Sequence, residues 1–206
     1  MRAATLTALL AATALCGCQA PPISQQAAVP PAGAAGRPAP GSRVEMLRAT
    51  NGARASTVNY LKPEGPDEDG LCVIRTGPDR RLAVNILGRG VHPDARREHV
   101  RMQAQVAGLQ VGSNASGFAN VPEASGLRSV QMELTYRVLR NETVTVPAGT
   151  FDTVVVQEQE RNSNCMAVYT AWLDKATRLP VRFHGEALNC VQVRQVDLVA
   201  GKLGRT

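Results

Sequence analysis

Two histidines stand close together in the sequence, each near an acidic residue, and imidazole and carboxylate groups are common ligands of transition metals. In the stretch HPDARREH, His92 precedes Asp94, and Glu98 precedes His99. The stretch lacks the His-Glu-x-x-His pattern that presents two zinc ligands on one helix face. A solvated, charged turn explains it better than a weak metal site, so we expect no bound metal.

The other groups that could perform acid–base or nucleophilic chemistry also lack a supporting pattern. His184 stands near Glu186 and Tyr169 in the expected sheet, but such neighbours are routine on an outward sheet face. Ser113 and Ser125 are outside any Gly-x-Ser-x-Gly elbow, which would expose a nucleophilic serine. A Gly-x-x-x-x-Gly-Lys phosphate loop is absent as well. The sequence therefore predicts a protein that is not an enzyme, with no catalytic residue and no cofactor.

A pair of cysteines near the N-terminus, Cys16 and Cys18, offers a different chemistry. They end an apolar segment that follows a single positive charge at Arg2 and is too short to span a bilayer, which needs about 20 residues. This layout is typical of a secretory signal. Its end, Leu15-Cys16-Gly17-Cys18, resembles the lipobox of bacterial lipoproteins.

The lipobox resemblance implies that residues 1–17 are a signal peptide and that Cys18 becomes the acylated N-terminus. The alternatives are an ordinary signal peptide or a Cys-x-Cys metal or redox pair, and a metal pair would need further ligands nearby. Several acyl chains on one cysteine give a lasting anchor, whereas a single chain binds reversibly. Gln19 follows, as in Gram-negative lipoproteins sent to the outer membrane, so we expect the inner leaflet of the outer membrane, facing the periplasm.

Residues 18–42 are expected to form a disordered tether, followed by one domain at residues 43–206. The tether is rich in Pro, Ala, Gly and Gln and has almost no large apolar side chain, so it cannot offset the entropy of ordering. The domain is long enough to bury its own core. The formal net charge of +6 is modest, and the sequence lacks the dense basic and aromatic stripe of a nucleic-acid-binding protein. We therefore expect no nucleic acid partner.

Short strands are the main elements expected in this domain. Apolar and polar residues alternate over residues 129–139, and Val-Pro-Ala-Gly separates that run from an extended run starting at Phe151. Further strands are expected near residues 70–77, 81–88, 165–174, 179–190 and 191–199. Because no strong helical period appears among the later runs, we predict an all-β fold with an antiparallel meander.

Two segments of the first half are ambiguous. Residues 45–61 fit either a short helix or a strand interrupted at Asn51 and Gly52. Residues 97–109 can be drawn as a helix, but Val100, Met102 and Val106 fall in an alternating pattern. We favour a strand for residues 97–109.

The stretch DKATRLPV predicts a register for two of the later strands. If it is a hairpin loop that pairs Asp174 with Val181, then Cys165 falls opposite Cys190. In an oxidising periplasm this pair is a disulfide candidate, and closing a loop of roughly 25 residues stabilises a fold by about 3 kcal/mol. Cys72 is then left over, either as a buried thiol or as an alternative partner for one of the two.

Two stretches, VTVPAGTF and WLDKATRLPV, resemble a feature of uncharacterised secreted families of Gram-negative bacteria. In those families a strand ending in Val-Pro-Ala-Gly-Thr-Phe precedes a Trp-bearing strand, an acidic loop and Leu-Pro-Val; the matching residues here lie within Val144–Phe151 and Trp172–Val181. The families look like curved antiparallel half-barrels, akin to outer-membrane lipoprotein carriers that hold acyl chains in an apolar concavity. The resemblance implies a curved sheet, either a half-barrel or an open barrel, with room for one short helix. It carries over no binding or catalytic residue.

Two functions fit this prediction. In the first, the concavity binds a lipid or other hydrophobic ligand, and the expected register places Trp172, Phe183 and Val168 on one apolar face. These three and Met132 are the candidate lining residues, although all four would suit a plain core equally well. In the second, the protein is a scaffold that binds an envelope protein or cell-wall partner through a sheet edge or loops. A pocket of roughly 300 Å³ or more would favour the ligand.

Overall fold

The computed structural model describes residues 42–205 except 51–52, 76–79, 123–127 and 189–195, and it describes side chains outside residues 48–62 and 205. The expected signal peptide, the acylated Cys18 and the tether up to residue 41 lie outside this part of the chain. The described strands are β1 (Ser42–Thr50), β2 (Ala53–Pro66), β3 (Cys72–Arg75), β4 (Arg81–Val84), β5 (Asn114–Pro122), β6 (Ser129–Val146), β7 (Gly149–Arg161), β8 (Met166–Asp174), β9 (Pro180–Leu188) and β10 (Val196–Arg205). The helix α1 (Arg96–Val106) follows a 3-10 turn at Pro93–Ala95.

All the described strands belong to one sheet with the order β4-β3-β2-β1-β10-β9-β8-β7-β6-β5. Every neighbouring pair in this order is antiparallel. Strands that are consecutive in sequence are neighbours in the sheet, except β4 and β5, and the first and last strands, β1 and β10, pair with each other. The edge strands β4 and β5 are not paired with each other, so the sheet stays open. The prediction of an all-β, curved antiparallel sheet with one short helix is therefore confirmed.

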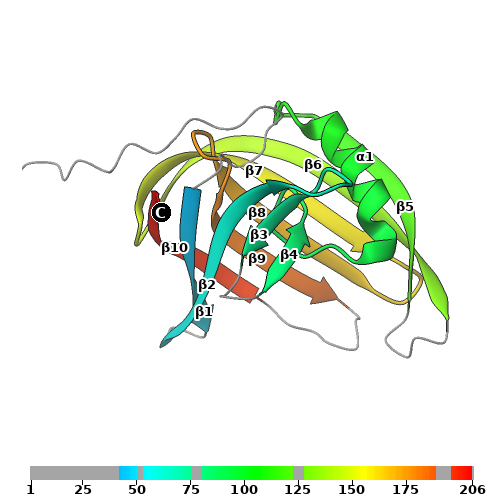
Figure 1. Cartoon of the computed structure of the whole chain (residues 1–206), viewed down its shortest axis with the longest axis horizontal. Helices are drawn as coiled ribbons and strands as arrows, with labels where there is room; N and C mark the ends of the chain where they lie inside the picture. The colour runs from blue at the N-terminus through cyan, green and yellow to red at the C-terminus, as the bar shows by residue number, and fades with distance from the viewer. Residues whose placement is uncertain (1–41, 51–52, 76–79, 123–127, 189–195, 206) are drawn as a thin grey trace, which may run out of the picture.

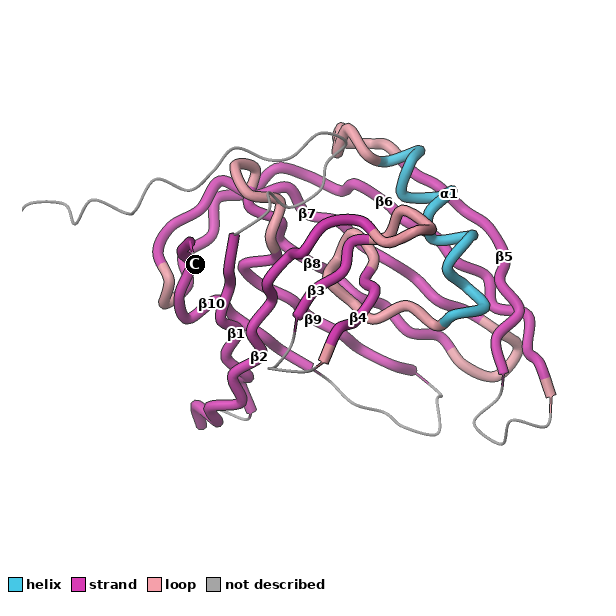
Figure 2. The backbone as a smooth tube through the Cα atoms, in the orientation of Figure 1, coloured by secondary structure: helices cyan, strands magenta, loops and turns pink. Residues whose placement is uncertain are grey.

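The sheet curls strongly, and β3 and β4 lie over β8 and β9 with α1 beside β5 (Figure 1). The tube view shows α1 as the helical segment among long strands (Figure 2). A register shift between Val138 and Arg140 bends the long β6–β7 hairpin. At the tip of this hairpin, the backbone N–H of Ala148 donates to the carbonyl of Ala200 at 3.0 Å. The hairpin is thereby tied to β10.

Residues 96–106 form a helix, so the strand favoured for residues 97–109 is wrong. The buried residues of α1 are His99, Met102 and Val106, which recur at helical spacing and face the sheet. The alternating Val100 and Ala104 are only half-buried and exposed, respectively. Tertiary packing therefore selects the period of the helix. Over residues 45–61 the strand alternative is the correct one, since β1 and β2 lie on either side of residues 51–52.

The predicted register of β8 and β9 is wrong by one residue. Trp172 pairs with Arg182, and Phe183 pairs with Ala171. The reason is a tighter loop: the N–H of Asp174 donates to the carbonyl of Leu179 at 2.9 Å, so the hairpin closes earlier than expected. A one-residue slip moves a side chain to the other face of a sheet, so Trp172 and Phe183 lie on opposite faces at this pair of strands.

The Asp174 carboxylate holds this loop closed. It accepts hydrogen bonds from the N–H of Thr177 at 2.9 Å and from the Thr177 hydroxyl at 2.6 Å. Arg178 follows with a φ of 62°, a left-handed conformation that turns the chain back towards β9. The alternation of apolar and polar residues in the strands does not reveal this side-chain cap, so it did not enter the predicted register.

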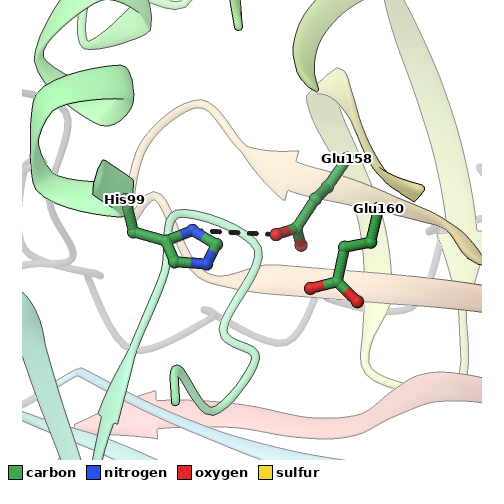
Figure 3. Close-up of side chains that lie close together, drawn as sticks. All are labelled: His99, Glu158 and Glu160. Carbon is green, nitrogen blue, oxygen red and sulfur yellow. Dashed lines mark ion pairs between the residues drawn. The ribbon is translucent and has the colours of Figure 1, made fainter. Parts of the chain in front are cut away.

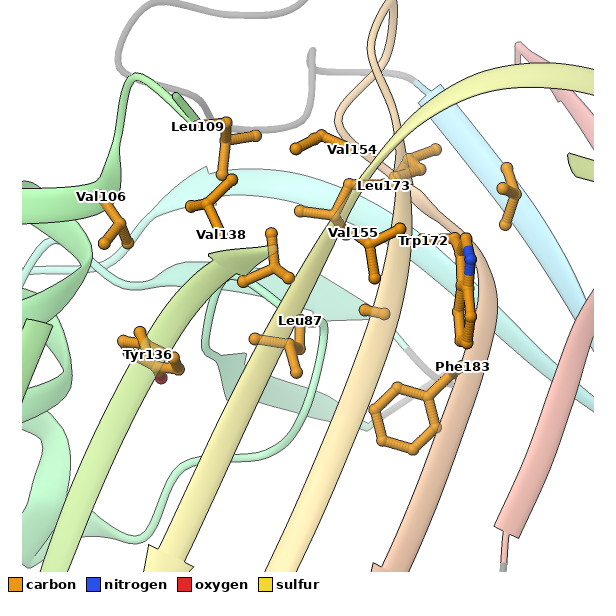
Figure 4. Close-up of a cluster of buried hydrophobic side chains, with 14 of the residues drawn as sticks. Leu87, Val106, Leu109, Tyr136, Val138, Val154, Val155, Trp172, Leu173 and Phe183 are labelled. Carbon is orange, nitrogen blue, oxygen red and sulfur yellow. The ribbon is translucent and has the colours of Figure 1, made fainter. Parts of the chain in front are cut away.

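The core fills the curve of the sheet with aliphatic side chains from the strands, α1 and the loop after β4 (Figure 4). Valine and leucine dominate, and Tyr136 is the largest fully buried side chain. The labelled members are Leu87, Val106, Leu109, Tyr136, Val138, Val154, Val155, Trp172, Leu173 and Phe183. The core includes residues from β1 to β10, so the described strands share one hydrophobic core.

Candidate functional site

A buried acid, Glu158, lies at the centre of a polar cluster on the inner face of the sheet. It follows Val154 and Val156 on β7 at the period of two, so it faces the same side as these buried valines. Glu158 is 0% exposed. Its cross-strand neighbours are Tyr136 on β6 and Tyr169 on β8. An acid in this position requires partners, because a buried charge without them is costly.

The loop after β4 supplies two of these partners. The side-chain oxygen of Asn85 accepts from the N–H groups of Leu87 at 3.0 Å and Arg89 at 3.1 Å. Its amide nitrogen donates to Glu158 Oε2 at 2.8 Å. Asn85 thus shapes the loop and anchors it to β7, and the same loop brings Arg89 to the carboxylates.

Arg89 is held between two carboxylates and an aromatic ring. One of its terminal nitrogens donates to Glu158 at 2.7 Å and to Glu160 at 3.0 Å. Its guanidinium carbon lies 3.5 Å from the centroid of the Tyr169 ring. Burial opposes the charged form of Arg89, but the two carboxylates outweigh it and raise the pKa of Arg89. Burial also raises the pKa of Glu160, against the opposing effect of Arg89. Arg89 is therefore a permanent cation of the cluster.

His99 connects α1 to the same acid through Tyr136. Its Nδ1 atom is 2.6 Å from the Tyr136 hydroxyl, which donates to Glu158 at 3.4 Å. Burial lowers the pKa of His99, although Glu158 acts in the other direction. Burial and the nearby Glu158 raise the pKa of Tyr136 well above its ordinary value. The cluster therefore contains a neutral imidazole and a neutral phenol at pH 7, and it ties the helix to the sheet.

His99, Glu158 and Glu160 have the residue types of a metal site, and their ligand atoms lie within 4.8 Å of one another (Figure 3). The donor set nevertheless fits a metal poorly. Arg89 already bonds to both carboxylates, and the histidine Nδ1 faces Tyr136. A metal ion would have to displace a permanent cation from a buried position. The arrangement is suited to an ion-pair network that joins three parts of the fold.

Next to this cluster is an apolar pocket of about 260 Å³. It lies between the inner face of the sheet and the strands β3 and β4, and it is half open to solvent. Its lining residues are Met46, Ile74, Arg80, Leu82, Leu87, Gly88, Arg89, Pro180, Phe183 and Leu198. Most of the lining is aliphatic or aromatic, which is the usual character of a site for a small hydrophobic molecule.

The wall of the pocket is connected to the buried cluster by stacked planar groups. The centroid of the Phe183 ring lies 6.1 Å from that of the Tyr169 ring. The Arg89 guanidinium in turn packs over the Tyr169 ring. Gly185 makes this stack possible, since a Cβ atom there would lie 2.9 Å from the Tyr169 ring. The pocket wall is therefore fixed by the same ion pairs that hold the loop after β4.

Of the four candidate lining residues, Phe183 is the one that lines this pocket. Trp172 is buried elsewhere: its Nε1 donates to Glu142 at 3.1 Å, and the Arg182 guanidinium lies 4.6 Å from its ring centroid. Val168 is half-buried and pairs with Glu186. Met132 is half-buried on β6, packed against the core. The four do not form one surface.

The other residues singled out in the sequence are dispersed. His92 and Asp94 are exposed and 3.7 Å apart, and Glu98 pairs with Arg101, so His99 alone reaches the cluster. His184 instead contacts Asp197 at 2.6 Å.

The cysteines give no test of the predicted disulfide. Cys165 is half-buried just before β8, while Cys190 lies outside the described residues, so this pair stays a prediction. Cys72 is half-buried on β3, with its sulfur 3.8 Å from the carbonyl oxygen of Val73.

Sequence reasoning missed Asn85, Arg89, Glu158 and Glu160 as members of the cluster. One signal was present: in VVVQEQE, Glu158 and Glu160 fall in phase with Val154 and Val156, so two acids occupy an apolar face. The position of Arg89 could not be foreseen, because it comes from a loop 69 residues away from Glu158.

A second hollow, of about 360 Å³, lies between the β6–β7 hairpin tip and β9–β10. Its lining includes Pro147, Arg182 and Asp197, and it is as open as the first. With one cation and one acid, it has less of the apolar character expected for a hydrophobic ligand. In the described part of the chain, no helix has the length and apolarity needed to cross a membrane.

Comparisons with known proteins give a distant similarity in fold. No family model matches the sequence, and no curated protein matches it. The hypothetical lipoprotein YmcC from Escherichia coli is 13% identical, with a TM-score of 0.47 over 82% of this chain and 89% of that one. A candidate lipoprotein from Parabacteroides distasonis is 12% identical, with a TM-score of 0.41 over 81% and 96%. A candidate exported protein with a YmcC-like fold from Bacteroides fragilis is 11% identical, with a TM-score of 0.38 over 82% and 97%.

Proposed function

We propose that this protein is a lipid-anchored protein of the bacterial cell envelope that binds a small hydrophobic molecule in the pocket beside Phe183. The observation that carries the proposal is the lining of the pocket, which consists mainly of apolar side chains on the inner face of the sheet. Its volume of about 260 Å³ is below the roughly 300 Å³ set above for a ligand site, so the pocket suits only a small apolar group. Sites for small molecules are typically concave, apolar and largely preformed.

The pocket is preformed because ion pairs hold its walls. Leu87 and Gly88 come from the loop that Asn85 and Arg89 fix to Glu158. Phe183 stacks on Tyr169, which Arg89 covers. A wall set in advance lowers the ordering cost of binding, which favours affinity for a small ligand.

The lipid anchor is proposed from the lipobox resemblance at Leu15, Gly17 and Cys18. An acylated Cys18 would keep the domain near the outer membrane, facing the periplasm, on the tether that precedes Ser42. A membrane surface is a rich source of amphipathic molecules, so the anchor and the pocket support one another in this proposal.

A scaffolding role is the second candidate, and Phe118 favours it. This side chain is 61% exposed on the edge strand β5. Exposed aromatic residues at an edge are suited to partner contacts. Strand addition along this edge is hindered, because Arg101 donates to the backbone carbonyl of Ser116 at 2.7 Å. A partner would therefore dock on the outer face around Phe118.

Native mass spectrometry tests the ligand proposal. The domain from Ser42 onward is purified from the periplasm without detergent, and retained molecules are extracted with organic solvent. Leu82 lines the pocket, so Leu82→Trp should fill it and remove the retained mass. Val111→Trp adds the same side chain at a residue that is 46% exposed, and it should keep the ligand.

Bare polypeptide in the unsubstituted domain would contradict the proposal and would leave the scaffolding role as the better explanation. Retention of the same molecule by the Leu82→Trp variant would also contradict it, because the ligand would then lie elsewhere. In that case the Phe118→Ser variant, tested for loss of co-purifying envelope proteins, distinguishes the scaffold.

A further inference from the structure

The charged residues that line the proposed pocket are all cationic. Arg80 and Arg89 are the two charged members of the lining, and the described lining contains no carboxylate. The remaining surface is apolar apart from backbone groups. Such a pocket disfavours a cationic ligand and is compatible with a neutral or an anionic one.

Arg89 is not suited to hold a ligand headgroup. Its charge is already balanced by Glu158 and Glu160, and one face of its guanidinium is covered by Tyr169. A third acid at this point would be close to two existing carboxylates. The inner end of the pocket therefore suits an apolar group, packed against Leu87 and Phe183.

Arg80 differs from Arg89 both in its exposure and in the balance of its charge. It is exposed directly before β4, and it has no ion pair among the residues that the structure describes. The next residue, Arg81, points elsewhere and pairs with Glu64 at 2.7 Å. Arg80 thus supplies a positive charge at the solvent side of an apolar pocket.

The size of the pocket restricts the apolar part of the ligand. At about 260 Å³ it is smaller than the usual range of roughly 300–1,000 Å³ for drug-sized ligands. It can accept a single chain, whereas two parallel acyl chains would not fit. Its open side allows a longer chain to extend beyond the lining.

We infer that the ligand is a single-chain amphiphile with one anionic headgroup, whose chain contacts Leu87 and Phe183 and whose headgroup lies at Arg80. This inference rests on the proposed ligand-binding function. The anionic group can be a carboxylate, as in a fatty acid, or a phosphate, as in a lysophospholipid. Both share one chain and one acidic headgroup.

The test compares four ligands with the same ten-carbon chain: decanoate, decyl phosphate, decanol and decyltrimethylammonium. Binding to the domain from Ser42 onward is measured by isothermal titration calorimetry, below the micelle concentration and at low salt. We expect the two anions to bind at least threefold more tightly than decanol, which corresponds to a modest exposed ion pair. The cation should bind most weakly. The tighter of the two anions identifies the headgroup.

Two adjacent variants locate the charge. Arg80→Gln should bring the affinities for the two anions down to that for decanol, measured on the same variant. Arg81→Gln removes the same charge from the neighbouring residue, and it should keep the preference, because Arg81 is paired with Glu64.

The outcomes separate the two proposals. Equal binding of all four ligands, or an anion preference that survives Arg80→Gln, would overturn the headgroup inference and leave the hydrophobic pocket standing. Failure of all four ligands to bind would overturn both.

Discussion

The Arg89 guanidinium lies 2.7 Å from the carboxylate of Glu158, whose side chain is 0% exposed. This pair joins the loop after β4 to β7, two parts of the chain that are 69 residues apart. Asn85 bonds to the same carboxylate at 2.8 Å and Tyr136 at 3.4 Å, so Glu158 is the point at which the loop and the sheet meet. The predictions below test this connection and the pocket that depends on it.

Replacing Arg89 with Met should lower the free energy of unfolding at pH 7 by about 3 kcal/mol, because it leaves a buried carboxylate without its cation. Urea denaturation followed by circular dichroism measures the change. The double variant Arg89→Met, Glu158→Gln should recover part of the loss, since the buried charge is then gone. The control is Arg81→Met, which breaks an exposed pair and should have little effect. Equal stability of the Arg89→Met variant and the wild type would show that the pair does not hold the loop.

Acidification should destabilise the protein through His99. Burial holds the pKa of His99 below 6.5 in the folded state, so the unfolded state binds a proton more readily. The stability that the neutral imidazole contributes is complete above pH 6.5, and it is lost as the pH falls from there to the folded pKa. Glu160 acts in the opposite sense, because its raised pKa favours the folded state at low pH.

The contribution of His99 is obtained by difference. The free energy of unfolding is measured at pH 7.5 and at pH 5.5 for the wild type and for His99→Gln. The wild type should lose more stability than the variant between these two values, since Glu160 and the other groups are common to both. A loss of the same size in both proteins would contradict the assignment.

Gly185→Ala should destabilise the fold and weaken ligand binding together. The added Cβ would lie 2.9 Å from the Tyr169 ring, which must then leave its position between Phe183 and Arg89. Overpacking of this kind costs about 1–3 kcal/mol. The matched control is Gly204→Ala on β10, where a Cβ would meet no atom within 4 Å. Thermal unfolding of the two variants and decanoate titrations give the comparison.

The single tryptophan should not report ligand binding. Trp172 is paired with Arg182 and bonds to Glu142, while Phe183 lines the pocket. Decanoate should therefore leave the emission of Trp172 nearly unchanged, and Trp172→Phe should bind decanoate like the wild type. Phe183→Leu should bind it more weakly, because the stack on Tyr169 is lost. A large shift of Trp172 emission on binding would place the ligand against the other face.

The strands could be predicted from the sequence because their signals are local. Alternation in β6 and the Pro-Ala-Gly turn before β7 depend on neighbouring residues, and these elements were expected correctly. The helix α1 was not predicted. The helical spacing of His99, Met102 and Val106 becomes clear only once the face that they bury is known. The register of β8 and β9 failed for a related reason, since the Asp174 cap shortened the loop.

The candidate site was largely beyond prediction. Phe183 was expected near a ligand from its apolar neighbours, and it does line the pocket. Glu158 was not identified from the sequence, because its partners Asn85 and Arg89 come from a distant loop. Local pattern gives the face on which a residue lies, but long-range pairing decides whether a polar residue there is buried and satisfied.

The position of β1 within the sheet has a mechanical consequence. This strand is hydrogen-bonded to β2 on one side and to β10 on the other, and Ser42 pairs with Arg205. Tension on the chain that precedes Ser42 is therefore resisted by two rows of hydrogen bonds at once, whereas an edge strand would peel away from one. Met46 on the same strand lines the pocket, so a load applied through the chain that precedes Ser42 would reach the pocket before it reached either edge of the sheet.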